Sequence, residues 1–233
     1  MFIIGITGPT GAGKTTALRV LEALGGQVID CDAVYHRLLE TDGELLGRIE
    51  AAFPGAVKDY ALDRKALGAR IYGDPEALER LTEITWPFVV REVERWLAEA
   101  ETSRSCHSKP GPERSQRRSE GSVSPSTDTP PEQATGRQIA GATGFTVIDA
   151  IGLFESGLGE QCDLTVAVVA DEETRVRRLM ARDGISEAYA RARIAAQKSA
   201  EWYAERADLV LENNGTETEF AELCRTAFAE RLT

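Results

Sequence analysis

Short apolar runs alternate with helix-spaced stripes along the first third of this chain. Residues 2–7, FIIGIT, form an apolar run interrupted only by glycine, which is typical of a buried parallel strand. Over residues 14–24 the apolar positions recur every three or four residues until a Gly-Gly pair ends the pattern. Residues 27–32, QVIDCD, predict a second strand with acidic residues at its carboxyl end. Strand, helix and strand in this order indicate a βαβ unit and a parallel sheet.

Residues 33–100 show helical periodicity, with glycine and proline between the segments. No strand pattern is evident among them, so we expect a helical insert over one end of the sheet. Pro87 lies inside the last helical stripe, where a proline is expected to kink or interrupt the helix.

Strand and helix patterns return after residue 144. FTVIDAIGLFES (145–156) predicts a strand followed by a loop, and CDLTVAVVA (162–170) predicts another strand. Helices are expected over 171–184, 186–207 and 217–232, with a last strand in DLVLENNGT between them. The elements together predict a three-layer α/β fold around a parallel five-stranded sheet, with all 233 residues in one domain.

The composition changes abruptly over residues 102–144. This segment is rich in Ser, Thr, Pro and Gly and offers few large apolar side chains. Such a segment buries too little apolar surface to offset its ordering entropy, so we predict a disordered insert. Its arginines leave a basic interaction segment as an alternative.

The formal charge of −11 and the pI of about 4.8 disfavour broad contact with nucleic acid or with an anionic membrane. No stretch reaches the roughly 18 apolar residues of a membrane span, and the N-terminus lacks a basic region before its apolar run. We therefore expect a cytoplasmic protein, and we favour a monomer. The cysteine and histidine spacing does not fit a zinc site.

The segment Gly8–Thr15, GPTGAGKT, fits the phosphate-loop pattern G-x-x-x-x-G-K-[ST]. Its glycines allow a concave backbone whose N–H groups point inward, and the following helix directs its positive end at the phosphates. Lys14 is expected to reach the outer phosphates, and the Thr15 hydroxyl to bind Mg²⁺. The motif lies between a predicted strand and a predicted helix, which is the context that it requires.

Two acids, Asp30 and Asp32, close the second predicted strand. The carboxyl ends of parallel strands form the ligand-binding edge of a sheet, so a carboxylate there can accept a proton from an attacking hydroxyl or hold Mg²⁺ through water. Period-two alternation would place both side chains on one face of an extended chain. The alternative is that these residues are helix caps or solvated loop acids.

Arg175, Arg178 and Arg182 share one face of the helix predicted over 171–184. Such a stripe can bind phosphates and stabilise the charge of phosphoryl transfer, although a solvated face paired with nearby acids would look the same. Asn213-Asn214-Gly215 follows the last strand, where the sequence alone favours a plain turn.

Taken together, these motifs resemble the dephospho-CoA kinase family, whose fold is that of the P-loop NTPases. The resemblance rests on GITGPTGAGKTT, VIDCDAVYHRLL, ARIYGDPEALERLTEITWPFVVREV, RVRRLMARDGISEAYARARIAAQ and ADLVLENNGT, which cover nearly the whole chain outside 102–144. It implies an ATP- and Mg²⁺-dependent kinase that phosphorylates the ribose 3'-hydroxyl of dephospho-CoA. No nucleic-acid partner is implied.

The resemblance also implies roles for individual residues. Asp32 would be the general base, and Lys14, Arg178 and Arg182 would be catalytic. The implied nucleotide-binding residues are Gly11, Ala12, Gly13, Lys14, Thr15, Thr16, Asn213 and Gly215, the last two beside adenine. Residues 55–100 would form the CoA-binding subdomain and 171–200 a lid, and Glu155 would lie near the substrate.

The chain departs from the family at Trp86, where many members have a histidine before proline, and in the 102–144 insert. The alternative enzyme is another small-molecule P-loop kinase, acting on a nucleoside or a nucleoside monophosphate. A GTPase-like switch is disfavoured because no Asn-Lys-x-Asp guanine reader is present.

Overall fold

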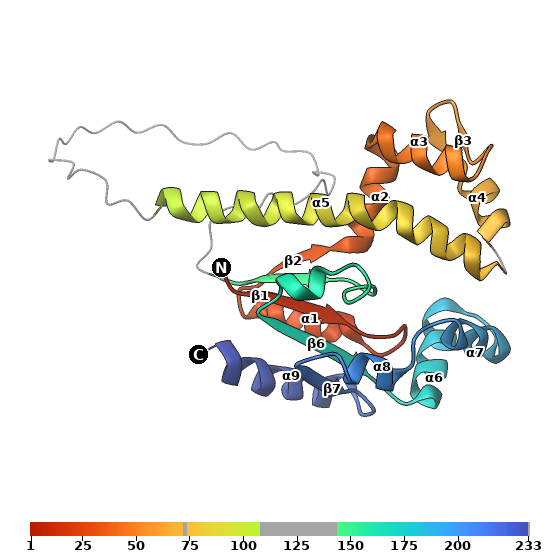
Figure 1. The fold of residues 1–233 in the computed structure, drawn as a ribbon. Coiled ribbons are helices and arrows are strands. Elements are labelled where there is room, and N and C mark those ends of the chain that lie inside the picture. The colour runs from red at the N-terminus through yellow and green to blue at the C-terminus, as the bar shows by residue number, and fades with distance from the viewer. Residues whose placement is uncertain (72–73, 108–143, 233) are drawn as a thin grey trace, which may run out of the picture.

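The computed structural model describes residues 1–71, 74–107 and 144–232, with the side chains of 103–107 left out. Its main sheet has the strand order β2-β5-β1-β6-β7, and every pairing is parallel (Figure 1). The strands are β1 (Ile3–Thr7), β2 (Gln27–Asp30), β5 (Thr146–Asp149), β6 (Leu164–Val169) and β7 (Leu209–Glu212). The predicted parallel five-stranded sheet is thus confirmed.

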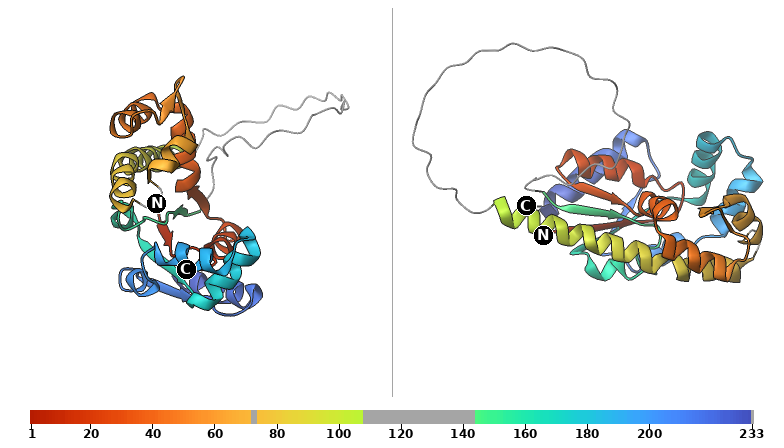
Figure 2. Two further views of the ribbon diagram at one scale, coloured as in Figure 1. Left: turned by 90° about the vertical axis from the view of Figure 1, so that its right-hand side faces the viewer. Right: turned by 90° about the horizontal axis from the view of Figure 1, so that it is seen from above.

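Alternation along the strands divides the buried side chains between two faces of the sheet. Val147 faces a core formed with helices α1 (Lys14–Ala23) and α9 (Glu217–Leu232). The next residue, Ile148, faces a core formed with α2 (Cys31–Thr41) and α5 (Pro75–His107). Ala167 and Val169 of β6 instead pack against Tyr203 of α8 (Ala200–Ala204). Figure 2 shows α1 and α9 side by side on one face and α5 on the other, which confirms the three layers.

The insert between β2 and β5 is mainly helical, as predicted, but it also contains a short antiparallel hairpin. Its elements are α2 (Cys31–Thr41), α3 (Gly43–Ala52), β3 (Val57–Lys58), β4 (Ala61–Leu62), α4 (Arg64–Ile71) and α5 (Pro75–His107). The expectation that no strand interrupts residues 33–100 was therefore wrong. The turn residues Asp59 and Tyr60 both have positive φ, at 50° and 62°, without the glycine that usually signals such a turn.

Helix α5 corrects one further expectation and narrows another. Pro87 does not interrupt the helix, and both Pro87 and Glu83 are exposed, so water can satisfy the carbonyl that proline leaves unpaired. A kink at Pro87, the other expected outcome, stays a prediction. The helix also runs on to His107, so residues 102–107 are helical rather than disordered. The remainder of the predicted insert, residues 108–143, lies outside the described residues.

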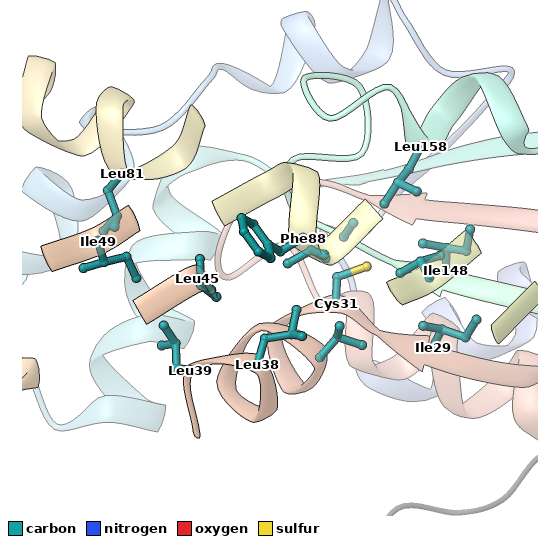
Figure 3. Close-up of a cluster of buried hydrophobic side chains, with 14 of the residues drawn as sticks. Ile29, Cys31, Leu38, Leu39, Leu45, Ile49, Leu81, Phe88, Ile148 and Leu158 are labelled. Atoms are coloured by element: carbon teal, nitrogen blue, oxygen red, sulfur yellow. The ribbon is translucent and has the colours of Figure 1, made fainter. Parts of the chain in front are cut away.

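The insert and the sheet share one hydrophobic core. Phe88 of α5 packs in the same cluster as Leu45 of α3, Cys31 at the start of α2 and Ile148 of β5 (Figure 3). Because one cluster joins these elements, the insert is anchored to the sheet at the end of β2 rather than tethered loosely to it.

Replacing Phe88 by Ala should lower the free energy of unfolding by about 3–5 kcal/mol, since Phe88 is only 2% exposed and the truncation leaves a cavity. Leu78→Ala on the same helix is the matched control, because Leu78 is 51% exposed, and we expect a change within about 0.5 kcal/mol. Urea denaturation measures both. Equal losses in the two variants would contradict the shared core.

The segment 171–200, called the lid segment below, lies beyond the carboxyl end of β6. It contains α6 (Glu172–Asp183) and α7 (Glu187–Ala195), and it is followed by α8 (Ala200–Ala204). Gly184 ends α6 with a φ of 65°, and the Ser186 side chain caps α7 by accepting from the Tyr189 N–H. The two helices enclose a small core of their own, formed by Val176, Leu179, Ala190 and Ile194.

Candidate active site

The phosphate loop joins β1 to α1 in a conformation that requires its glycines. Gly13 has a φ of 100°, and a Cβ atom there would lie 2.2 Å from Asn213 Nδ2. Within the described residues, no side chain caps the amino end of α1, and its first turn carries no acidic residue. The Thr16 N–H donates to the Gly13 carbonyl at 3.1 Å. The positive end of α1 lies at the loop, and phosphate binding there stays a prediction.

A cavity of about 760 Å³ lies over this loop. Its lining includes Gly11, Gly13, Lys14 and Thr15 of the loop, Asp32 of α2, Asp149 of β5, Arg178 and Arg182 of α6, and Arg193 and Gln197 further along the lid segment. The cavity thus brings together the predicted phosphate loop, base and lid arginines. Of the other predicted nucleotide-binding residues, Ala12 of the loop is fully buried and Thr16 lies in the first turn of α1.

Lys14 stands between the loop and the acids of the cavity. Its Nζ donates to the Gly8 carbonyl at 3.1 Å. Burial lowers the pKa of Lys14, while the nearby carboxylates of Asp149 and Asp32 raise it in opposition. A lysine placed in this way can exchange its carbonyl contact for a phosphate oxygen.

Asp30 and Asp32 have separate tasks, which corrects the expectation that they share one face of a strand. β2 ends at Asp30, whose Oδ1 accepts from the Asp32 N–H at 2.8 Å and from the Ala33 N–H at 3.0 Å. Asp30 is therefore the cap of α2, in agreement with the alternative interpretation. Asp32, in the first turn of α2, is exposed and lines the cavity.

Asp149 is a cavity residue that the sequence analysis missed. It ends β5, directly between Asp30 of β2 and Ile6 of β1 in the strand register. Burial, with a smaller contribution from Asp30 and Asp32, raises the pKa of Asp149 to about 6 against the opposing effect of Lys14. A signal was present, because Val-Ile-Asp ends both β2 and β5.

Asp149→Asn should change how stability depends on pH. Since the folded protein binds the Asp149 proton more tightly than the unfolded chain, stability is lost as pH rises from about 4 to about 6. Relative to the wild type, the variant should gain roughly 2–3 kcal/mol in free energy of unfolding between pH 4 and pH 7. Urea denaturation at both pH values, with a chelator present, measures this difference, and a pH-independent difference would contradict it.

The three arginines of α6 do not act as one stripe. Arg178 and Arg182 line the cavity, whereas Arg175 is only 4% exposed and its Nε donates to the Thr10 carbonyl at 2.9 Å. Arg178 donates to the carbonyls of Ala12 at 3.3 Å and Asn213 at 2.9 Å, which ties α6 to the loop and to the turn after β7. The predicted common face therefore holds for two of the three.

Asp183 links two cavity arginines from different helices. It pairs with Arg182 at 2.6 Å and with Arg193 of α7 at 2.7 Å. These contacts lower the pKa of Asp183 to about 2, so the carboxylate stays ionised and holds both guanidinium groups at neutral pH. Arg193 is a second cavity residue that the sequence analysis did not select.

The turn after β7 supports the loop from behind. Asn213 is buried, its N–H donates to the Val169 carbonyl, and its Nδ2 donates to the Ala12 carbonyl at 2.8 Å. Arg178 also donates to the Gly215 carbonyl at 3.2 Å. The turn is thus part of the loop's framework, and the contact of Asn213 and Gly215 with adenine stays a prediction.

Trp86 and Glu155, which the family resemblance singled out, do not line the cavity over the phosphate loop. Trp86 packs against the chain after β5 so closely that a Cβ atom on Gly152 would lie 2.4 Å from its indole ring. Trp86 therefore has a packing role in this protein. Glu155 is exposed and is not among the residues that line the cavity.

The chemistry of the cavity fits Mg²⁺ held together with a nucleotide. The Thr15 hydroxyl and the carboxylates of Asp32 and Asp149 are oxygen donors that line the cavity. Across the described ranges, no group of three or more His, Cys, Asp or Glu side chains is placed to hold a metal. Mg²⁺ commonly uses one or two protein oxygens and takes its other ligands from phosphates and water, so this donor set is sufficient.

Comparison with known proteins identifies the family. The dephospho-CoA kinase family model matches residues 2–109 and 131–219. The chain belongs to the dephospho-CoA kinase family. A dephospho-CoA kinase from Geobacter sulfurreducens is 35% identical over 234 residues and is matched over 100% of both chains. One from Anaeromyxobacter dehalogenans is 36% identical over 217 residues, which cover 92% of this chain and 85% of that protein.

Solved structures agree with the fold described above. The crystal structure of TT1252 from Thermus thermophilus has a TM-score of 0.69 and 31% identity, covering 100% of this chain and 98% of that one. A dephospho-CoA kinase from Campylobacter jejuni, with a TM-score of 0.52 and 19% identity over 98% of this chain and 96% of its own, supports the fold. A shikimate kinase from Bacteroides thetaiotaomicron, with a TM-score of 0.50 and 13% identity, covers 99% of this chain and 98% of its own and shares the fold alone.

Proposed function

We propose that this protein transfers the γ-phosphoryl group of ATP to the ribose 3'-hydroxyl of dephospho-CoA, forming coenzyme A and ADP, the last step of coenzyme A biosynthesis. The observation that carries the proposal is the single cavity in which the phosphate loop, Asp32 and the lid arginines meet in a chain of the dephospho-CoA kinase family. The loop supplies a phosphate cradle that ends in Lys14 and Thr15, and membership of the dephospho-CoA kinase family favours ATP as the donor.

In the proposed mechanism Asp32 accepts the proton of the 3'-hydroxyl as its oxygen attacks the γ-phosphorus and the bond to the ADP oxygen breaks. Lys14 and Arg182 face the cavity with positive charge, which stabilises the negative charge spread over the transferring group. Arg178 contributes mainly by holding the loop, through its bonds to Ala12 and Asn213. Mg²⁺, held at Thr15 and the neighbouring carboxylates, would neutralise phosphate charge.

We assign the two flanking segments to substrates. The insert around residues 55–100 would bind the CoA portion, since it adjoins Asp32 through α2 and is anchored in the core at Phe88. The lid segment would close over ATP and exclude water.

We also place the protein in the cytoplasm as a monomer, with no nucleic-acid or membrane partner. In the described part of the chain, no helix is long and apolar enough to cross a bilayer.

An acceptor panel tests the proposal. The purified protein is incubated with Mg-ATP and, in turn, dephospho-CoA, adenosine, uridine and AMP, while ADP release is measured against a reaction without acceptor. Of the four acceptors, we expect only dephospho-CoA to cause rapid release of ADP. Phosphorylation of a nucleoside or of AMP, without dephospho-CoA turnover, would favour the alternative of another small-molecule kinase.

A further inference from the structure

Thr10, in the middle of the phosphate loop, has both of its backbone polar groups bonded to side chains of the lid segment. Its N–H donates to Gln197 Oε1 at 2.9 Å, and its carbonyl accepts from Arg175 Nε at 2.9 Å. Arg175 lies in the first turn of α6, and Gln197 follows the end of α7. The two ends of the lid segment therefore meet on one residue of the loop.

The chemistry of each contact is specific. A backbone N–H can only donate, so Thr10 requires the amide oxygen of Gln197, and its carbonyl requires a donor such as the Arg175 guanidinium. The backbones are also in close contact, because a Cβ atom on Gly11 would lie 3.1 Å from the Arg175 carbonyl oxygen and 3.2 Å from its Cα. A shift of the loop toward α6 at this point would therefore displace the start of that helix.

The burial of the Arg175 side chain indicates that its hydrogen bond to Thr10 does more than fill space in the core. The side chain is 4% exposed, and its buried Nη2 has no hydrogen-bond partner among the residues that the structure describes. An unpaired buried N–H destabilises a fold, and an apolar residue of similar length would avoid that cost. An apolar residue at this position would, however, lose the hydrogen bond that Arg175 makes to the Thr10 carbonyl.

We propose that Arg175 and Gln197 are positioning residues that couple the lid segment to the phosphate loop through Thr10. Nucleotide phosphates shape the loop, the loop holds both ends of the lid segment, and the segment carries Arg182 and Arg193 over the cavity. Loop geometry and arginine placement then change together. The inference rests on the proposed function only in taking ATP as the ligand of the loop.

A double-mutant cycle with two substitutions by methionine, which removes the polar groups and keeps an unbranched side chain, tests the coupling. Arg175→Met, Gln197→Met and the double variant are titrated with ADP and Mg²⁺ by calorimetry, and kcat and KM for ATP are measured with dephospho-CoA. Each single change should raise the ADP Kd roughly tenfold, the typical worth of such a hydrogen bond. Because both hydrogen bonds act through Thr10, the ADP Kd of the double variant should be about the same as that of the weaker-binding single variant.

Arg175→Gln provides a rescue, since its Nε2 takes the place of arginine Nε and can still donate to Thr10. It should keep the ADP Kd within about threefold of the wild type. A role based only on charge or on filling space would instead make the Gln and Met variants equally defective. Arg225→Met on α9 and Gln161→Met beside Glu94 remove surface contacts elsewhere and serve as controls with wild-type Kd.

Several outcomes would overturn the coupling: additive losses in the double variant, failure of the Gln rescue, or unchanged ADP affinity in both single variants. If Arg175→Met does not fold, Gln197→Met at a half-exposed position decides alone, and a wild-type Kd for ADP there overturns the proposal. ADP binding needs no acceptor. Failed turnover of dephospho-CoA with an intact cycle would therefore remove the proposed function and leave the coupling in place.

Discussion

Asp32→Asn should lower kcat by roughly 10²–10⁴-fold while the KM for ATP changes little, because it removes the proton acceptor and keeps the shape of the side chain. Asp32 is exposed, lines the cavity and lies in the first turn of α2. Initial rates with ATP and dephospho-CoA varied in turn measure kcat and both KM values.

Asp30→Asn is the matched control, two residues away. Asp30 caps α2 through its Oδ1, and asparagine caps helices as well as aspartate does, so kcat should fall less than tenfold. An unchanged kcat in Asp32→Asn, or an equal fall in the two variants, would remove Asp32 from the role of base.

Lys14→Met should lower kcat/KM for ATP by roughly 10²–10³-fold, the usual effect of deleting one group that stabilises transition-state charge. Lys14 has a place in the cavity, and its present contact with the Gly8 carbonyl at 3.1 Å is one that a phosphate oxygen can replace. Methionine lacks only the terminal ammonium group of an otherwise similar unbranched side chain, so the loss would report the missing charge.

Thermal melting separates this loss from unfolding. Because burial lowers the pKa of Lys14, the charged form is held at a cost, and the variant should melt within a few degrees of the wild type. Near-normal kcat/KM in a well-folded Lys14→Met variant would contradict the assignment of the loop to ATP phosphates.

Features that depend on local chemistry were predictable from the sequence. The phosphate loop and the end of α6 at Gly184 follow from glycines, which tolerate a positive φ. The cap of α7 follows from Ser186, whose side chain accepts from an N–H group that the helix leaves unpaired. The strand assignments followed from apolar runs. All of these are set within a few residues of chain.

Features that depend on tertiary contacts were not predictable in this way. Arg175 fits the spacing of a phosphate-binding face, yet the first turn of α6 lies against Thr10, so the guanidinium supports the loop from outside the cavity. Asp149 ends an apolar strand, and its importance arises only because β5 pairs with both β1 and β2. The prediction that Asp30 and Asp32 share one face of a strand was wrong because Asp30 caps α2, so the chain is helical from Cys31 onward.

The most direct test of the account is the structure of the product formed from dephospho-CoA. The purified protein is incubated with Mg-ATP and dephospho-CoA, and the products are analysed by mass spectrometry and by ³¹P and ¹H NMR. We predict coenzyme A phosphorylated on the ribose 3'-oxygen, with one ADP released for each molecule formed. Absence of a phosphorylated product, or attachment of phosphate at the 2'-oxygen, would contradict the account.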